Sequence, residues 1–285
     1  MDLEEKILEG IRLAETTIPQ DVYNHLLEIY KNEENEISKS QLKSIIDNVE
    51  YAKEKKLPIC QDTGTQTFFV DMGYDFPYKN ELVNAIRNSV RKATELYYIR
   101  PNAVHPFTGK NPGNNIGRFI PYIHWDLREG NDAIVYILPK GGGSENASAL
   151  AMLKPGEGIK GVKKFVVDTV VKAGANPCPP TIVGVGIGGA ADLSLNLAKR
   201  SLLRPLGKRH EEEIVAKLEL ELLDLLNRTE VGTMGWGGKY SVIDVHVEYA
   251  YRHPATLPVG VIVQCWADRR ANVHIYADGK VEVEQ

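Results

Sequence analysis

Three cysteines spread over most of the chain are the sequence feature that most constrains its fold. Cys60, Cys178 and Cys265 each lie in a loop-like segment, and none belongs to an apolar helical stripe. An odd number of widely separated cysteines argues against a disulfide framework and indicates a reducing compartment. If folding brings the three thiols together, they can hold three corners of a [4Fe-4S] cluster and leave the fourth iron open to a substrate. Electron-carrying clusters, in contrast, usually bind four cysteines.

The cysteine count alone also fits two plainer interpretations. A free cysteine is often a small buried apolar residue without any chemistry of its own. Three cysteines and one of the seven histidines could also form a structural zinc site, although the chain has no CxxC pair to favour it. Metal and sulfide content separates these alternatives, because only an iron–sulfur protein contains acid-labile sulfide.

Length and composition limit the class of protein. A chain of 285 residues with 43% hydrophobic and 25% charged residues is typical of a globular protein with a large core. The net charge of -4 argues against nucleic-acid binding. The charged N-terminus does not resemble a signal peptide, and no apolar stretch is long enough to span a membrane. We therefore expect a cytoplasmic protein that binds neither nucleic acid nor a membrane.

Hydrophobic periodicity predicts a mixed α/β (α+β) fold. Residues 1–58 are largely helical in pattern, with a capping box of Ser38 and Gln41 and a helix that ends before Pro58. We expect a single large domain over residues 1–285, in which a mixed or antiparallel sheet is surrounded by helices. The predicted helices are residues 38–56, 80–98, 147–153, 157–172, 189–203 and 210–227. The predicted strands are residues 66–71, 118–126, 132–139, 181–185, 240–250, 258–264 and 271–276, of which 118–126 and 132–139 form a hairpin.

Two segments between these elements have the composition of functional loops. Residues 99–117 are long and irregular, and their Arg100, His105 and Lys110 favour a functional role. Residues 140–146 read Lys-Gly-Gly-Gly-Ser-Glu-Asn, and three successive glycines let backbone N–H groups approach a ligand closely. If a helix begins at Ala147, this segment is an anion site at a helix N-terminus. An ordinary strand-to-helix turn is equally consistent with it.

A third glycine-rich segment matches the G-x-G-x-x-G pattern of dinucleotide sites. It runs from Gly184 to Gly189, between a predicted strand and a predicted helix. That helix is followed by a second predicted helix, where a dinucleotide-binding unit has a strand that ends in Asp or Glu. A tight strand-to-helix turn is the favoured interpretation, and an NAD-binding oxidoreductase is a distant alternative.

Five short motifs cover nearly the whole chain: Cys60-Gln61-Asp62-Thr63-Gly64, Arg100-Pro101-Asn102-Ala103-Val104, Lys140-Gly141-Gly142-Gly143-Ser144-Glu145-Asn146, Asn176-Pro177-Cys178-Pro179-Pro180 and Cys265-Trp266-Ala267-Asp268-Arg269-Arg270. In this order they resemble the motifs of the class I (iron–sulfur) fumarate hydratase and L-tartrate dehydratase family, in its α-subunit or N-terminal catalytic domain. The resemblance implies that Cys60, Cys178 and Cys265 bind a [4Fe-4S] cluster with one open iron. It also implies contacts to a dicarboxylate substrate from Gln61, Asp62, Arg100, Gly143 and His253.

The resemblance further implies that this chain is only part of an active site. Single-chain members of the family continue into a second domain, and in two-subunit members that part is a separate β-subunit. The proton-abstracting base is expected there, so no catalytic base is assigned to this chain. We expect a homodimer of α-subunits or an α2β2 assembly. The expected reaction is the reversible hydration of fumarate to (S)-malate, and the alternative is the dehydration of L-tartrate to oxaloacetate.

Overall fold

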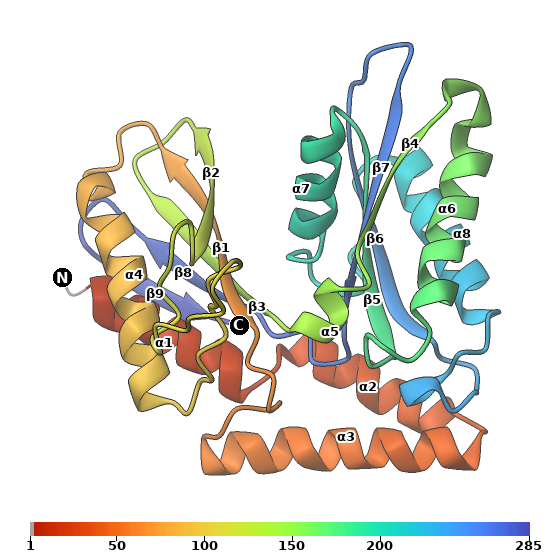
Figure 1. Ribbon diagram of the computed structural model, residues 1–285, viewed down its shortest axis with the longest axis horizontal. Helices are drawn as coiled ribbons and strands as arrows, with labels where there is room; N and C mark the ends of the chain where they lie inside the picture. Colours follow the sequence, from red (N-terminus) through yellow and green to blue (C-terminus); the bar gives the residue numbers. More distant parts are fainter. Residues whose placement is uncertain (1–2) are drawn as a thin grey trace. The chain divides into compact units, whose positions relative to one another are not determined.

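The computed structural model describes residues 3–285, so Met1 and Asp2 of the charged N-terminus lie outside the described residues. Contacts between residues divide the chain into two compact units, each with its own sheet (Figure 1). The first unit contains residues 3–20, 48–142 and 269–285, and the second contains residues 21–47 and 143–268. Each unit is built from separated segments, so no single cut in the sequence divides them. The single domain over residues 1–285 stays a prediction.

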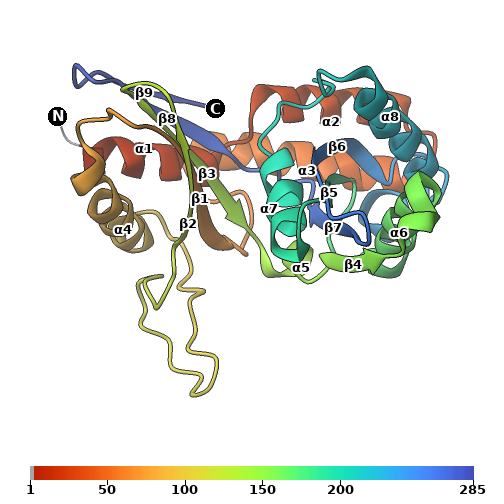
Figure 2. The same cartoon turned by 90° about the horizontal axis from the view of Figure 1, so that it is seen from above.

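The first unit has a five-stranded mixed sheet with the order β2-β1-β3-β8-β9. β1 is parallel to β2, and the other neighbouring strands are antiparallel. Helices α1 (Leu3–Thr16) and α4 (Lys79–Leu96) cover one face of this sheet (Figure 2), where Ile11, Phe68 and Val135 are part of the core. The strands are β1 (Thr65–Gly73), β2 (Tyr122–Arg128), β3 (Ala133–Lys140), β8 (Ala271–Ile275) and β9 (Val281–Glu284).

The predicted hairpin of residues 118–126 and 132–139 is wrong, because β1 lies between β2 and β3. The middle of β1 is completely buried, as suits a central strand, whereas β2 exposes Trp125 and Leu127 at the edge of the sheet. The segment of residues 99–121 that leads into β2 contains no helix and no strand, and it projects away from the first unit (Figure 2). The expectation of a long irregular segment is confirmed.

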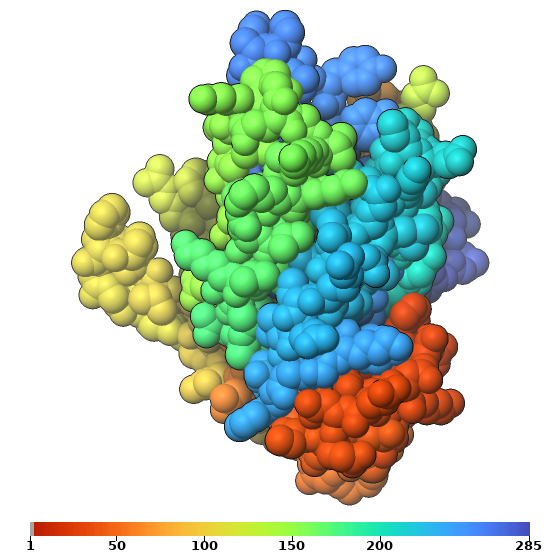
Figure 3. Space-filling model, turned by 90° about the vertical axis from the view of Figure 1, so that its right-hand side faces the viewer, coloured from red at the N-terminus to blue at the C-terminus, as the bar shows by residue number. Residues whose placement is uncertain are grey.

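The second unit has a four-stranded mixed sheet with the order β4-β7-β5-β6. β5 (Thr181–Gly188) is parallel to β6 (Val242–Ala250), and β7 (Leu257–Gln264) is antiparallel to both β5 and β4 (Ala149–Leu153). Helix α7 (Ala191–Ser201) covers one face of the sheet. On the other face α6 (Gly158–Ala173) and α8 (Glu213–Asn227) lie side by side (Figure 3). Helix α2 (Gln20–Asn32), after its first residue, and α3 (Glu36–Lys55) up to Asp47 also belong to this unit.

The close approach of α7 to the sheet explains the glycines of β5. A Cβ atom on Gly186 would lie 1.9 Å from the carbonyl oxygen of Ser194, and one on Gly184 would lie 2.1 Å from that of Ala198. Both glycines lie inside the strand and not in the turn after it, where the glycines of a dinucleotide site contact the pyrophosphate. The G-x-G-x-x-G pattern therefore has a packing role in this fold.

The mixed α/β class with mixed sheets is confirmed, and two local predictions besides the hairpin are wrong. Residues 147–153 are not a helix, because β4 occupies Ala149–Leu153 and the preceding helix α5 (Gly142–Glu145) is a single turn. The anion site that depended on a helix beginning at Ala147 is therefore not formed. α3 also begins before the predicted capping box, since Asn35 Oδ1 accepts the N–H groups of Ile37 and Ser38 (3.1 and 3.0 Å). Within residues 3–285, no helix combines the length and apolar character needed to cross a membrane.

Candidate functional site

Cys60 lies in a loop of the first unit that is held in place by hydrogen bonds to residues of two helices. The preceding residue, Ile59, donates its N–H to the carbonyl oxygen of Glu15 at the end of α1 (3.0 Å). The carbonyl oxygen of Ile59 accepts a hydrogen bond from the side-chain amide of Asn48 in α3 (2.8 Å). Cys60 itself is half-buried and forms no disulfide. A thiol in such an anchored loop has its position defined before any metal binds.

The carboxylate of Asp62 joins this loop to the glycine-rich segment after β3. One oxygen accepts the N–H of Gly64 (2.9 Å), and the other accepts the N–H of Gly142 (2.8 Å). Gly64 has a φ of +71°, and a Cβ there would lie 2.5 Å from the backbone of Lys140, so only glycine fits this turn. The predicted substrate residue Gln61 lies between the anchored residues Ile59 and Asp62, and its side chain is exposed.

Arg100 is attached to the same loop at the start of the projecting segment. Its N–H donates to Thr63 Oγ1 (3.0 Å), and the side-chain amide of Asn102 donates to the carbonyl oxygen of Gly64 (2.9 Å). Asn115 crosses the segment and binds both the carbonyl oxygen of Arg100 (2.9 Å) and the N–H of Asn102 (2.7 Å). The first unit therefore brings together Cys60, Gln61, Asp62 and Arg100, four of the predicted site residues.

Cys178 and Cys265 lie at one end of the sheet in the second unit. Cys178 precedes β5, Cys265 follows β7, and the N–H of Trp266 donates to the carbonyl oxygen of Cys178 (3.3 Å). Cys178 has a φ of +54°, which places it in the left-handed region that non-glycine residues rarely adopt. Gly143 lies nearby, since a Cβ on it would be 3.2 Å from the carbonyl oxygen of Asn176. This unit therefore groups Cys178, Cys265 and Gly143.

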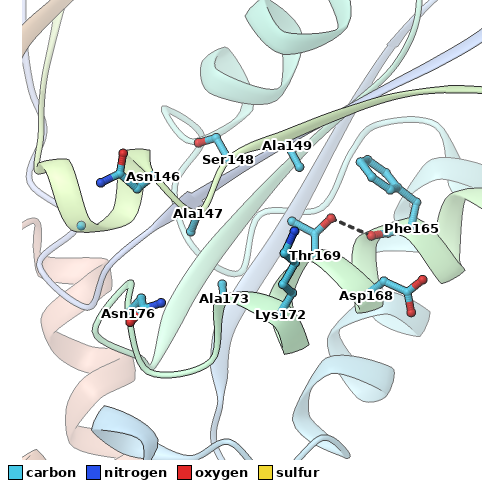
Figure 4. Close-up of a pocket in the computed structure, with 11 residues that line it drawn as sticks. Asn146, Ala147, Ser148, Ala149, Phe165, Asp168, Thr169, Lys172, Ala173 and Asn176 are labelled. Atoms are coloured by element: carbon cyan, nitrogen blue, oxygen red, sulfur yellow. Dashed lines mark hydrogen bonds between the residues drawn. The ribbon is translucent and has the colours of Figure 1, made fainter.

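A pocket of about 370 Å³ opens beside Gly143 in the second unit (Figure 4). Asn146 and Ser148 line it from the connection between α5 and β4, and Thr169 and Lys172 line it from α6. The hydroxyl of Thr169 is used by the helix itself, because it donates to the carbonyl oxygen of Phe165 (2.8 Å). The pocket places hydroxyl, amide and ammonium groups next to the predicted substrate contact of Gly143.

His253 is the one predicted site residue of the second unit that lies elsewhere. It belongs to the loop between β6 and β7, next to Gly188 at the far end of β5, whereas both cysteines are at the Thr181 end. The eight residues of β5 span more than about 20 Å from one end of the strand to the other. His253 Nδ1 accepts the N–H of Ala255 (3.1 Å) within its own loop. The structure therefore separates His253 from Cys178 and Cys265 of the same unit.

Two buried charged residues behind the Cys60 loop were not predicted as part of the site. Glu15 at the end of α1 has no exposed surface, and Arg269 is 1% exposed. The guanidinium of Arg269 donates to Glu15 Oε2 (2.9 Å) and to the carbonyl oxygen of Asp62 (2.9 Å). Burial raises the pKa of Glu15 to about 7, against the opposing effect of the positive charge on Arg269. The run Cys265-Trp266-Ala267-Asp268-Arg269-Arg270 was the only sequence signal for Arg269.

The residue types of the three cysteine loops fit the chemistry of an iron–sulfur cluster. All three cysteines are half-buried thiols in loops, and soft thiolate ligands favour iron–sulfur clusters and zinc over magnesium or calcium. In the described part of the chain, residues 3–285, no three His, Cys, Asp or Glu side chains converge on a position for a single metal ion. A [4Fe-4S] cluster makes a different demand, since each thiolate binds a separate iron atom.

Comparison with known proteins agrees with these motifs along nearly the whole chain. The family described as fumarate hydratase (fumerase) matches residues 4–274. A putative L(+)-tartrate dehydratase subunit alpha of Methanocaldococcus jannaschii is 46% identical over 285 residues, which cover 99% of this chain and 100% of that protein. The L(+)-tartrate dehydratase subunit alpha of Escherichia coli K12 is 37% identical over 277 residues, or 97% of this chain and 91% of that protein. The protein of the same name from Shigella sonnei gives the same values.

Proposed function

Because the chain belongs to the class I fumarate hydratase and L-tartrate dehydratase α-subunit family, a family of hydro-lyases, we propose that it is the α-subunit of an L(+)-tartrate dehydratase. In this reaction L-tartrate loses the hydroxyl group of C2 and a proton of C3 as water, and the resulting enol rearranges to oxaloacetate. The observation that carries the choice is the similarity, over nearly the whole chain, to proteins named for tartrate.

The second candidate is the reversible hydration of fumarate to (S)-malate, the main expectation from the sequence. It is supported by the description of the matching family as fumarate hydratase. Malate differs from tartrate only in lacking the hydroxyl group on C3, so both substrates need the same carboxylate contacts. We rank fumarate second because the relatives compared above are named for tartrate.

Family membership implies an iron–sulfur enzyme, and we propose Cys60, Cys178 and Cys265 as the three ligands of a [4Fe-4S] cluster. When bound, the cluster supplies an open iron that acts as a Lewis acid on the departing hydroxyl group. The chain contributes loops of defined position. Ile59 and Asp62 are anchored on either side of Cys60, and the backbone N–H of Trp266 holds the carbonyl oxygen of Cys178.

The substrate contacts proposed for this chain are Gln61, Asp62, Arg100 and Gly143. Arg100 is exposed beside the Cys60 loop, and its planar guanidinium suits a bidentate contact to a substrate carboxylate. The backbone N–H of Gly143 is a second donor to that charge. The Asp62 carboxylate already accepts two N–H groups, yet a carboxylate has about four lone-pair sites and can still accept a substrate hydroxyl group. Fixed donors of this kind stabilise the negative charge that develops when the C3 proton leaves.

His253 needs a different arrangement if it contacts the substrate. It lies about 20 Å from Cys178 along the sheet of its own unit, beyond the reach of any side chain. We therefore propose that His253 contributes to the site of a second copy of the chain. This proposal requires a homodimer of α-subunits, which an α2β2 assembly contains.

A β-subunit is proposed as the partner that completes the active site. The relatives are named as alpha subunits, which implies a second kind of subunit. The proton-abstracting base is expected on that subunit, as in the resemblance described above. The isolated chain is then expected to bind its cluster but to turn over substrate slowly or not at all.

The test is a comparison of substrates with the complete enzyme. The chain is purified without oxygen together with its β-subunit, and kcat/KM is measured for L-tartrate, (S)-malate and fumarate. A clear preference for L-tartrate, with iron and sulfide near four each per α-subunit, supports the proposal. A preference for fumarate and malate replaces it with the second candidate. A fully active Cys178→Ala enzyme with unchanged iron content contradicts the cluster assignment.

A further inference from the structure

Arg269 and Glu15, a buried ion pair outside the predicted contacts, lie directly behind the Cys60 loop. We infer that this pair is a positioning device, which we call the Glu15–Arg269 clamp, and that it fixes Cys60, Gln61 and Asp62 in the geometry that the reaction needs. The inference rests on the proposed function for its catalytic consequence. Its structural part concerns only contacts within the first unit.

Arg269 supplies the clamp with two donors at fixed spacing. Nη1 donates to Glu15 Oε2 and Nη2 donates to the carbonyl oxygen of Asp62, both at 2.9 Å. The rigid fork of a guanidinium makes these two bonds at once, whereas a lysine ammonium is a compact point charge on a flexible stem. The loop carbonyl is thereby bound to a side chain that is itself buried, since Arg269 is 1% exposed.

Glu15 holds the other side of the same loop through its main chain. Its carbonyl oxygen accepts the N–H of Ile59 (3.0 Å), and its carboxylate binds both Arg269 and the side-chain amide of Gln66 (2.6 Å). Cys60 and Gln61 therefore lie between two anchored residues, Ile59 and Asp62. Ile59 is bound to the backbone carbonyl of Glu15, and Asp62 is bound to Arg269, which pairs with the Glu15 carboxylate.

Stability alone is a poor explanation for this arrangement. Burying a carboxylate and a guanidinium is costly, and well-packed apolar side chains of similar volume often stabilise a fold equally well. An apolar pair, however, cannot donate a hydrogen bond to the carbonyl oxygen of Asp62, which belongs to a loop and not to a sheet or helix. The gain specific to the charged pair is the defined position of the Asp62 carbonyl, and with it of the Cys60 loop.

The chain contains a matched control for this inference. In the second unit, Arg204 also bridges a buried carboxylate, that of Glu219, and a backbone carbonyl oxygen, that of Val247 (2.9 Å). Glu219, like Glu15, has no exposed surface. Arg204 also pairs with Glu248, and none of these three partners is a predicted site residue. Arg204→Lys therefore reproduces the general cost of replacing a buried bridging arginine.

The first measurement is amide hydrogen exchange of the metal-free chain with Arg269→Lys or Arg204→Lys. Arg269→Lys keeps a charge for Glu15 but loses the fork, so we expect exchange at residues 59–64 to rise at least about ten-fold, with little change in the second unit. Arg204→Lys leaves residues 59–64 at the wild-type rate. Unchanged exchange at residues 59–64 in Arg269→Lys, or an equal rise in both variants, overturns the clamp.

The second measurement uses the complete enzyme with its β-subunit. We expect Arg269→Lys to lower kcat at least about ten-fold while KM changes less than about three-fold, because Arg100 and Gly143 still bind the carboxylates. Equal effects of Arg204→Lys contradict a positioning role. If the wild-type enzyme binds no iron and converts neither substrate, the proposed function fails, and the exchange result still decides the clamp. If Arg269→Lys does not fold, Glu15→Asp, which keeps both charges, is measured in the same two ways.

Discussion

Replacement of Gly186 by alanine tests the packing of α7 against the sheet of the second unit. The new Cβ would lie 1.9 Å from the carbonyl oxygen of Ser194 and 2.7 Å from the backbone nitrogen of Ala198. Real Cβ atoms stay at least about 3 Å from such atoms, so α7 has to move outward by about 1 Å. Both obstacles are backbone atoms of one helix, so no rotation of a side chain relieves the overlap.

The expected cost follows from this displacement. Overpacking of a close-packed interior costs about 1–3 kcal/mol and occasionally more, and α7 contacts β5 and β7 together, so we place Gly186→Ala near 3 kcal/mol. Alanine also lowers the conformational entropy of the unfolded chain, and this offsets roughly 0.5–1 kcal/mol of the lost stability. The net loss of about 2–2.5 kcal/mol lowers Tm by roughly 3–5 °C for a chain of this size.

The assay is thermal and urea unfolding followed by circular dichroism, with Gly156→Ala as the matched control. A Cβ on Gly156 meets no atom within 4 Å, and this glycine has no positive φ. The control is expected to match the wild type or to exceed it by up to about 1 kcal/mol. If Gly186→Ala and Gly156→Ala unfold at the same temperature, the glycines of β5 are not required for packing, and a ligand-binding role for the 184–189 segment has to be reconsidered.

Three further outcomes are expected from single substitutions. Arg100→Ala should lower kcat/KM of the complete enzyme by about two orders of magnitude, since a donor to developing charge contributes roughly 3 kcal/mol; an effect below three-fold contradicts the contact. Cys178→Ala should leave the chain without iron after anaerobic reconstitution, as measured by iron and sulfide analysis. A hydrogen bond from Arg128 lowers the pKa of Asp132 to about 2, so its contribution to stability is complete above about pH 4 and lost as the pH falls towards 2. Asp132 is partly exposed, so this contribution is roughly 1 kcal/mol. In urea unfolding, Asp132→Asn should be less stable than the wild type by this amount above about pH 4, and the difference should disappear as the pH falls towards 2.

The elements with strong periodicity were predictable from the sequence, and their pairing was not. Helices over 80–98, 157–172 and 210–227 are found within a few residues of α4, α6 and α8, because each has an apolar stripe that local spacing reveals. The hairpin failed for a non-local reason. The short connection of residues 129–132 favours pairing of β2 with β3, but β1 pairs with both strands and lies between them. The choice between an edge and a centre depends on all strands of the sheet at once.

The candidate site was predictable from the sequence only where its residue types themselves indicate a function. Cysteines and a glycine run mark Cys60, Cys178 and Gly143 in the sequence, and each unit gathers its share of them. Glu15 gave no such signal, because a glutamate near the end of an amphipathic helix is usually solvated. Its burial results from the packing of α1 against the first sheet, which local sequence does not specify. His253 shows the converse, since its motif match did not reveal that it lies at the end of β5 opposite to Cys178 and Cys265.

Asp62 shows why the backbone and side-chain contacts of a site residue have to be distinguished before a role is assigned to it. Its carbonyl oxygen is bound by Arg269, and its carboxylate binds the N–H groups of Gly64 and Gly142. The residue after Gly142 is Gly143, whose N–H is the proposed substrate donor. Loss of the Asp62 carboxylate would therefore release the turn that presents this donor, in addition to removing any contact of Asp62 with the substrate. A loss of activity in an Asp62 variant therefore does not by itself establish direct contact with the substrate. If the same variant keeps its exchange protection at residues 140–143, release of the turn is excluded, and the loss of activity supports a direct contact.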